Sequence, residues 1–479
     1  MDASALPQFA PALPEIVLAV GALALILLGA IMGDRATSLI NGLALGLLAL
    51  ATGLVLVAPS DGAASFGGSF TVDAFARFMK VLAYVSAFAA LAISFDYMRR
   101  EKFARYEYAV LILLSTLGMS LMISATDLIA VYLGLELQSL ALYVIAAIHR
   151  DDRRSTEAGL KYFVLGALSS GMLLYGASLI YGTTGAVGFA DIAESLKSGH
   201  AGIGLVFGIV FLLSGFAFKI SAVPFHMWTP DVYEGAPTPI TAFFASATKV
   251  AGVAMFVRAV TEAFPTVTVE WRQVVIFVAI ASMALGSFAA IGQRNIKRLM
   301  AYSSIGHMGY VLVGLAAGTP EGVRGVAIYT AIYVAMTLGA FACILSMRVG
   351  DRYVEQIDDL AGLSRTNPAM AFVLAMILFS LAGIPPLAGF FAKFYVFYAA
   401  VNAGLTSLAV VGFVLSVIGA FYYLRLVKLI YFDEPTVTFA PMTGAAKAVL
   451  TVAGGFTLLY FIYPAPLTVA AAAAAQSLF

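Results

Sequence analysis

The chain has 479 residues, of which 62% are hydrophobic and only 11% are charged, and its mean hydropathy is +0.96. Soluble domains are roughly half apolar, so this composition excludes a water-soluble enzyme or binding module. The formal net charge of +1 offers no overall attraction for nucleic acid or acidic substrates. The single cysteine, Cys343, can form neither an intrachain disulfide nor an iron–sulfur site, because both need further cysteines.

Apolar runs of about 18 to 25 residues recur along the whole chain, and each is long enough to cross about 30 Å of hydrocarbon as a helix. We therefore predict an all-α integral membrane protein with about fourteen transmembrane helices in a single domain, 1–479. The first run follows acidic, proline-containing residues instead of a basic segment, so we expect no cleaved signal peptide. The predicted helices lie at 14–32, 39–57, 72–93, 106–124, 128–147, 158–182, 202–226, 237–260, 273–291, 297–317, 322–346, 369–400, 406–431 and 446–463.

The basic residues of the loops fall mainly on one side of the predicted membrane. When the loops are numbered alternately, seventeen basic residues lie on one side and three on the other. This asymmetry obeys the positive-inside rule, supports the helix count and predicts that both termini lie outside the cytoplasm. The larger set is Arg35, Arg99, Arg100, Lys102, Arg105, Arg150, Arg153, Arg154, Arg294, Lys297, Arg298, Arg348, Arg352, Arg365, Arg425, Lys428 and Lys447, and the smaller is Lys197, Arg272 and Arg324.

Proline interrupts two of the predicted helices, the seventh at Pro224 and the twelfth at Pro385 and Pro386. Because proline removes a backbone donor, we expect both helices to break at membrane depth, unless these prolines are ordinary residues of membrane helices. The breaks lie five helices apart, so their orientations are opposite, as in an inverted-topology repeat of helices 4–8 and 9–13. The corresponding segments are 1–100 (helices 1–3), 104–262 (first repeat), 272–432 (second repeat) and 446–479 (helix 14 and tail).

Four ionisable residues lie within predicted spans: Glu136, Lys219, Lys249 and Lys393. A charge at the bilayer centre costs at least about 2.5 to 3.5 kcal/mol, so these side chains should face the protein interior and mark an ion path. Lysine suits such a path because burial favours its neutral form, whereas a nearby carboxylate favours the charged form. When Glu136 approaches Lys219, the lysine would thus hold its proton, and when the two separate, the lysine would release it. A buried salt bridge that only locks helices together is the alternative.

Two further residues extend the predicted path. His307 lies mid-span among hydroxyl-bearing and small residues. A histidine suits a relay between Lys249 and Lys393 because it has two ring nitrogens. The alternative is a simple hydrogen bond from His307 to a backbone carbonyl or a serine. Lys161 is one turn from the basic end of its helix, where it could take up protons or simply extend to the membrane surface. Asp231 and Glu234 share a short aromatic loop on the basic side, suited to proton uptake or to contact with a neighbouring chain.

Two long motifs resemble the antiporter-like membrane subunits of respiratory complex I. They are Pro224-Phe-His-Met-Trp-Thr-Pro-Asp-Val-Tyr-Glu-Gly-Ala-Pro-Thr-Pro239 and Asn295-Ile-Lys-Arg-Leu-Met-Ala-Tyr-Ser-Ser-Ile-Gly-His-Met-Gly-Tyr310. With Glu136 and the two broken helices, the resemblance covers roughly residues 100 to 430. Related cation/proton antiporters and membrane hydrogenases share these motifs.

The resemblance implies roles for the residues already singled out. Glu136 and Lys219 would form the coupling pair, Lys249 the central relay and Lys393 the terminal donor, with His307 and Lys161 as connecting groups. NAD, FMN, iron–sulfur clusters and quinone would belong to partner subunits, and no cofactor or metal to this chain. Its partners would be a neighbouring antiporter-like chain, small membrane subunits and lipid, in a bacterial inner membrane.

The energy for transport must come from elsewhere. Moving one proton against about 180 mV requires roughly 4 kcal/mol, and the sequence has no phosphate-binding loop, cysteine cluster or dinucleotide fingerprint to supply it. Redox chemistry in partner subunits would therefore drive proton pumping. The alternatives are a cation/proton antiporter or membrane-bound hydrogenase subunit, and a non-conducting scaffold.

Overall fold

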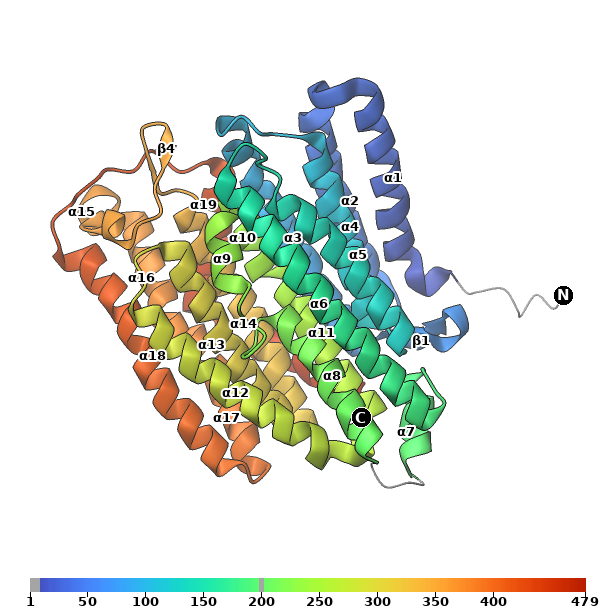
Figure 1. Cartoon of the computed structure of the whole chain (residues 1–479). Helices are drawn as coiled ribbons and strands as arrows, with labels where there is room; N and C mark the ends of the chain where they lie inside the picture. Colours follow the sequence, from blue (N-terminus) through green and yellow to red (C-terminus); the bar gives the residue numbers. More distant parts are fainter. Residues whose placement is uncertain (1–8, 198–201) are drawn as a thin grey trace.

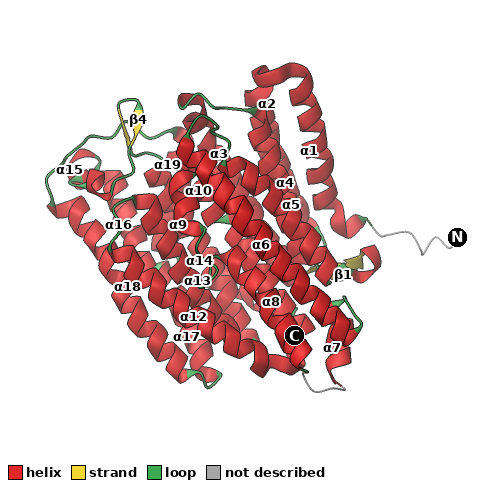
Figure 2. Cartoon of the chain, viewed as in Figure 1, coloured by secondary structure: helices red, strands yellow, loops and turns green. Residues whose placement is uncertain are grey.

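The computed structural model describes residues 9–197 and 202–479. Helices make up nearly all of this part of the chain, and strands form only two small hairpins (Figure 2). β1 (Asp61–Ser65) pairs with β2 (Phe70–Asp73), and β3 (Arg348–Val349) pairs with β4 (Arg352–Tyr353), both antiparallel. The predicted helical membrane protein is therefore confirmed in its architecture.

The helices follow one another in the predicted order. Eleven helical stretches among the described residues are long and apolar enough to cross a membrane, one of which contains both α1 and α2. The helices before the first proline break are α1 (Leu13–Met32), α2 (Thr37–Val57), α3 (Ala74–Arg100), α4 (Tyr106–Ser124), α5 (Leu128–Ala146), α6 (Arg153–Thr184), α7 (Phe189–Lys197) and α8 (Ile203–Ile220). Those after it are α9 (Thr229–Gly235), α10 (Thr238–Ala245), α11 (Ala247–Arg258), α12 (Thr268–Ile291), α13 (Ile296–Ala316), α14 (Pro320–Ile344), α15 (Leu363–Thr366), α16 (Pro368–Ala382), α17 (Ala388–Asn402), α18 (Thr406–Phe432), α19 (Gly444–Leu459) and α20 (Ala465–Gln476).

Both helices that contain the interrupting prolines break. α8 ends at Ile220, where Ser221 takes a left-handed conformation with φ +64°, and helix resumes only at Thr229. α16 ends at Ala382, where Gly383 has φ +91°, and α17 begins at Ala388. The structure adds a break that the sequence analysis missed, at Ser246 between α10 and α11.

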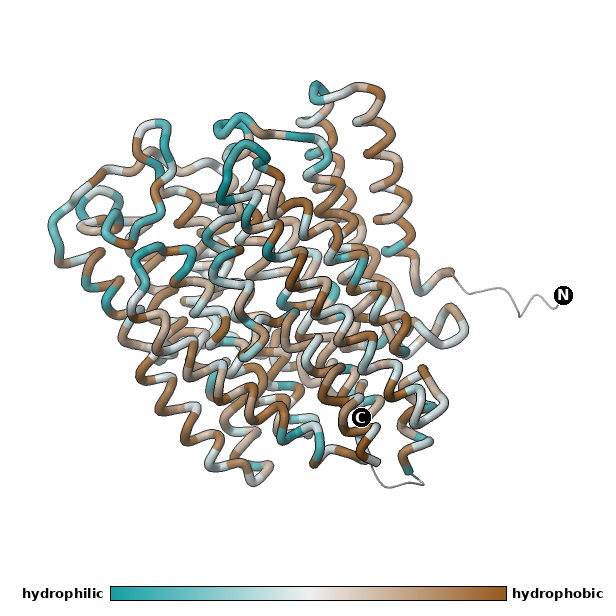
Figure 3. The backbone as a smooth tube through the Cα atoms, in the orientation of Figure 1, coloured by the Kyte–Doolittle hydropathy of each residue, from teal (hydrophilic) through white to brown (hydrophobic). Residues whose placement is uncertain are grey.

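The most deeply buried helices include those that carry Lys249 and His307. The most apolar part of Thr238–Ala263 is 100% buried and those of Ile296–Ala316 and Pro320–Ile344 are 94% buried, whereas that of the N-terminal pair is 22% buried. Figure 1 accordingly shows α1 standing at one edge of the bundle. Hydrophilic residues gather in the loops at the end where α1 meets α2 and β4 projects (Figure 3).

Close packing of helix pairs depends on glycine. A Cβ on Gly118 of α4 would lie 2.4 Å from the backbone nitrogen of Gln138 on α5, and a Cβ on Gly286 of α12 would lie 2.5 Å from that of Gly306 on α13. Small residues let membrane helices approach so closely that their backbones touch, which maximises van der Waals contact where lipid offers no hydrophobic drive. The α4–α5 and α12–α13 pairs therefore form rigid supports for the side chains between them.

Candidate functional site

Lys219 lies in the last turn of α8, just before the break, and is buried. Its ammonium donates a hydrogen bond to the Ser139 hydroxyl of α5 at 2.7 Å and lies 5.8 Å from the centre of the Tyr143 ring. Glu136 lies on α5, one turn before Ser139. It makes no ion pair with Lys219, and its buried Oε1 accepts no hydrogen bond. The structure thus shows the expected coupling pair apart, with a serine holding the lysine.

Lys249 is buried on α11, directly after the Ser246 break, and its ammonium donates to the hydroxyl of Ser221. The same hydroxyl accepts a hydrogen bond from Thr229 at 2.6 Å, and the ammonium lies 5.4 Å from the Trp228 ring centre. Ser221 occupies this position because α8 ends there. The proline break therefore supplies the partner of the central lysine, which the sequence analysis did not predict.

His307 is enclosed by tyrosines instead of carbonyl groups. Its Nδ1 lies 2.6 Å from the Tyr329 hydroxyl and its Nε2 lies 3.1 Å from that of Tyr423. Tyr423 is in turn 2.5 Å from the Ser303 hydroxyl. Each hydroxyl can donate one hydrogen bond and accept others, so this chain suits the transfer of protons in either direction.

Lys393 lies on α17 and is buried beside the second break. Its ammonium donates to the carbonyl oxygen of Ala382 at 2.9 Å and to the Ser416 hydroxyl at 2.8 Å. The carbonyl is free to accept because α16 ends at that residue. A small cavity runs between His307 and Lys393 and is lined by Ser287, Ser303, Gly306, Tyr310, Leu381, Ser416, Gly419, Tyr422 and Tyr423. These two predicted relay groups therefore share one polar space.

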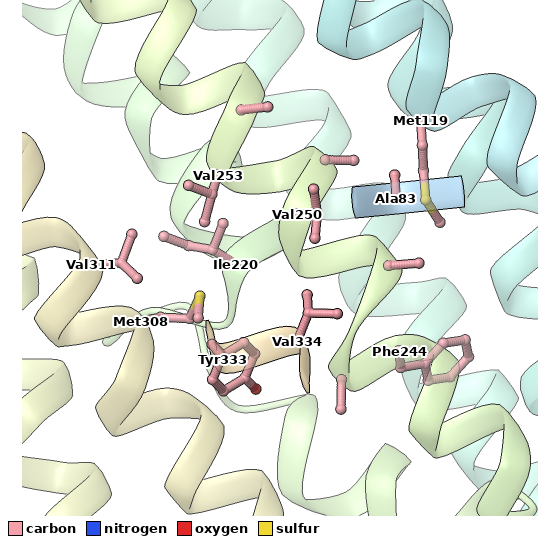
Figure 4. Close-up of a cluster of buried hydrophobic side chains, with 14 of the residues drawn as sticks. Ala83, Met119, Ile220, Phe244, Val250, Val253, Met308, Val311, Tyr333 and Val334 are labelled. Carbon is pink, nitrogen blue, oxygen red and sulfur yellow. The ribbon is translucent and has the colours of Figure 1, made fainter. Parts of the chain in front are cut away.

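An apolar layer separates the Lys249 group from the His307 group. Figure 4 shows Val253 of α11 and Ile220 of α8 near Met308 and Val311 of α13. Among the described residues no hydrogen bond joins Lys249 to His307. The predicted path thus consists of two polar groups with hydrophobic side chains between them.

Lys161 belongs to a network of charges at the start of α6. Its ammonium lies 2.7 Å from Asp231 and 2.9 Å from Glu157, and Arg298 lies 2.7 Å from Asp231 and 3.1 Å from Glu234. A cavity of about 160 Å³ opens among these side chains. Burial raises the pKa of the Asp231 carboxyl, but the hydrogen bonds from Lys161 and Arg298 outweigh this effect and hold the pKa below its ordinary value.

Lys161 connects α6 to α9 through its two ion pairs. It is 42% exposed, yet it bridges carboxylates of two elements far apart in sequence, α6 and α9. The network joins it to Asp231 and Glu234, the acidic residues of the aromatic loop, and to the first turn of α13.

The sequence analysis missed three buried ionic groups. Lys80 pairs with Glu15, Arg258 pairs with Asp73 and Glu262, and Lys297 pairs with Glu355 at 2.6 Å. Lys80 and Arg258 lie inside the predicted spans 72–93 and 237–260, so the presence of a charge within a span could have found both. The acidic partners Glu15, Asp73 and Glu262 lie near helix ends, where a charged residue is ordinary and does not indicate a buried ion pair.

Comparison with known proteins identifies the family of the chain. The family described as NADH:quinone oxidoreductase/Mrp antiporter, transmembrane, matches residues 125–419. NADH-quinone oxidoreductase subunit N of Methylobacterium nodulans is 62% identical over 99% of this chain and 98% of its own length. The subunit of the same name from Azorhizobium caulinodans is 63% identical over 99% and 100%.

Solved structures share the fold over nearly the whole chain. A chain of respiratory complex I from Thermus thermophilus has a TM-score of 0.83 and 33% identity, covering 96% of this chain and 99% of that one. A chain of the Mrp complex from Dietzia has a TM-score of 0.84 at 22% identity, covering 98% of each chain, and shows the fold alone. The identity to the curated relatives and the family match show that the chain belongs to the NADH:quinone oxidoreductase/Mrp antiporter family of membrane subunits.

Proposed function

We propose that this chain is the proton-translocating N subunit of the membrane arm of a bacterial NADH:quinone oxidoreductase. The observation that carries this proposal is the series of buried ammonium groups, Lys219, Lys249 and Lys393, in a chain 62% identical to such a subunit over nearly its whole length. Electron transfer from NADH to quinone takes place in partner subunits, which bind NAD, FMN, iron–sulfur clusters and quinone. The subunit supplies the path for protons and performs no redox step itself.

Proton release begins at Lys219. The Ser139 hydroxyl that now accepts from the ammonium is neutral, so it stabilises the charge less than a carboxylate would. Movement of Glu136 towards Lys219 would strengthen proton binding, and its return would weaken it. The unpartnered Oε1 of Glu136 supports this role, because a buried carboxylate oxygen without a hydrogen bond is unstable and gains from any approach of an ammonium.

The proton then passes through Lys249 to the His307 and Lys393 group. Ser221 accepts a hydrogen bond from Lys249 and lies two residues after Lys219, at the broken end of α8. It therefore links the first lysine to the second. The apolar layer around Ile220 requires water to enter before a proton can cross to His307. Such a dry layer blocks leakage while the complex is at rest. Tyr423 and the small cavity then carry the proton to Lys393.

Protons are taken up from the cytoplasmic side through the charge network at Lys161. Asp231 and Glu157 hold the lysine at the rim of an open cavity, between water and the interior. This proposal places the basic loops in the cytoplasm and both termini in the periplasm, as the loop charges predict.

The repeat organisation is part of the same proposal. We assign fourteen transmembrane helices, with helices 4–8 in residues 104–262 and helices 9–13 in 272–432, between the N-terminal helices in 1–100 and the last helix and tail in 446–479. The two breaks support this assignment, since each helix ends at a residue in the left-handed conformation. The lysines are not equivalent, because Lys219 precedes its break by two residues and Lys393 follows its break by ten. The two proposed repeats therefore have a similar broken helix but place its lysine at different positions relative to the break.

The test is to measure quinone reduction and proton pumping together in membrane vesicles that carry Lys219→Ala, with assembly of the complex checked in parallel. We expect an assembled complex in which pumping and coupled turnover fall together. Normal pumping in an assembled complex would show that the buried lysine is structural and would favour a scaffold. Sodium dependence of the pumping would favour a cation/proton antiporter.

A further inference from the structure

The relay leaves unused a second set of buried charges, at the end of the bundle opposite the basic loops. Glu15 is the third residue of α1 and Lys80 the seventh of α3, so both lie within about 10 Å of the starts of their helices. Figure 1 shows this end, with β1 and α7, away from the turn between α1 and α2. Buried charges in membrane helices are costly and commonly mark ion paths.

The first group of this set joins three helices through a chain of polar side chains. Lys80 and Glu15 lie 2.6 Å apart, with 2% and 4% of their side chains exposed. Ser120 of α4 donates to Oε1 of Glu15, and Tyr84 lies 2.6 Å from Ser120. The second carboxylate oxygen, Oε2, is buried and accepts no hydrogen bond. The hydroxyl chain thus ends at Oε1 of Glu15, where Ser120 could deliver a proton to the carboxylate.

The inner end of this chain lies on two helices that pack against the helix of the central lysine. Ala83 and Met119, the neighbours of Tyr84 and Ser120 in sequence, pack in the same buried cluster as Val250 (Figure 4). Val250 follows Lys249 on α11, which packs against both α3 and α4. The hydroxyl chain therefore starts beside the helix of Lys249, and Figure 4 shows Ala83 and Met119 on the other side of α11 from Met308 and Val311.

The second group leads from Lys80 to the surface. Asp73 caps the start of α3, seven residues or about two helical turns before Lys80. Arg258 binds both oxygens of Asp73 at 2.8 Å and Glu262 at 2.5 Å. Arg258 keeps its charge under all ordinary conditions, so it orients the two carboxylates without itself carrying a proton.

Exposure increases stepwise along this group. The side chain of Lys80 is 2% exposed, that of Asp73 8% and that of Glu262 23%. Glu262 lines a cavity of about 790 Å³ together with residues of the 67–69 loop, the start of α7 and the C-terminal Phe479. The buried charges are thus connected to an open space on the face opposite the basic loops.

We infer that Glu15, Lys80, Asp73 and Glu262 form a proton outlet from the first half of the relay to this cavity. A proton that Ser120 delivers to the Glu15 carboxylate, while Tyr84 replaces the proton of Ser120, cancels the negative charge that holds the proton of Lys80. Lys80 then passes its proton through water to Asp73 and Glu262, and regains one from Glu15 as the ion pair forms again. One proton enters and one leaves, with no other change in either side chain. This inference rests on the proposed relay through Lys249.

The decisive variant replaces both members of the buried pair, Glu15→Leu with Lys80→Met. Because no unpaired charge remains, the double variant should assemble, whereas either single change leaves a buried charge and should destabilise the complex. We expect an assembled complex with normal uncoupled quinone reduction but fewer protons pumped per NADH oxidised. A full proton yield in the assembled double variant would overturn the outlet, since the pair would then only hold α1 in place.

A second variant decides the matter if the double variant does not assemble. Glu262→Gln removes a proton-accepting carboxylate at the edge of the cavity and leaves the Arg258–Asp73 pair intact. We expect a lower proton yield, and an unchanged yield would overturn the outlet. Glu194→Gln is the matched control, because Glu194 is an exposed carboxylate paired with Lys197 at 2.5 Å and lies outside the cavity lining.

A Lys249→Met arm separates failure of the outlet from failure of the relay. If Lys249→Met lowers pumping and the Glu15, Lys80 and Glu262 variants pump fully, the relay stands and the outlet is refuted. If Lys249→Met pumps fully, the proposed relay fails and the outlet loses its source of protons.

Discussion

Replacing Tyr423 by phenylalanine tests whether His307 conducts protons through its tyrosine partners. The change removes one hydroxyl and leaves ring packing almost intact. That hydroxyl lies 3.1 Å from Nε2 of His307 and 2.5 Å from the Ser303 hydroxyl, so its loss leaves two buried polar groups without this partner. An unsatisfied buried group costs about 1–3 kcal/mol. If this cost falls on the proton-transfer step, pumping should slow about 5- to 150-fold, because each 1.4 kcal/mol corresponds to a factor of ten.

The assay is proton uptake or release by vesicles during NADH oxidation, measured beside the quinone reduction rate and the amount of assembled complex. Tyr398→Phe provides the control, since it makes the same chemical change on a 55% exposed side chain of α17. Pumping at the unmodified rate by an assembled Tyr423→Phe complex would refute the proposed transfer from His307 through this hydroxyl.

Three further changes test the charge network, the helix packing and the first lysine. Asp231→Asn should lower the thermal stability of the complex by the same amount at every pH between about 6 and 8, because the lowered pKa keeps the Asp231 carboxylate charged there. The stability difference should disappear only as the pH falls below the ordinary aspartate pKa of about 3.9. Gly286→Val should cost about 1–3 kcal/mol and lower the melting temperature of the complex, whereas Gly292→Ala, with no atom within 4 Å of the added carbon, should not. Ser139→Ala removes the 2.7 Å hydrogen bond of the Lys219 ammonium, worth about 1.5–3 kcal/mol, and should slow coupled turnover about tenfold or more, while Ser139→Thr retains activity; equal turnover in both variants would contradict the role of the hydroxyl.

The order of the helices could be predicted from the sequence because each span must satisfy its own backbone hydrogen bonds within the membrane. The two proline breaks were predictable for the same reason. The break at Ser246 was not, because no proline or glycine lies next to it and the residues on both sides are alanine, Ala245 and Ala247. The amphipathic helix α7 and the terminal helix α20 were also missed, since both are shorter than a membrane span.

The sequence by itself determined which side chains are costly to bury. In the structure Glu136 is partly buried, and the other four are buried: Lys219, Lys249, Lys393 and His307. A charge within an apolar run has this consequence whatever surrounds it, because the lipid is the alternative solvent.

Only the tertiary structure decided what each of these groups contacts. Lys219 and Ser139 are 80 residues apart, and His307 and Tyr423 are 116 apart. Such partners depend on which helices pack together and at what depth, and one-dimensional hydropathy contains neither quantity. The pairing of Lys80 with Glu15 shows the same limit, because the sequence does not say which charge of α3 Glu15 meets. Glu15 is the one charge of α1, whereas α3 contains Arg77, Lys80, Asp96, Arg99 and Arg100. Their charges meet because the packing of these helices with α4 brings them to the same depth, where each charge neutralises the other.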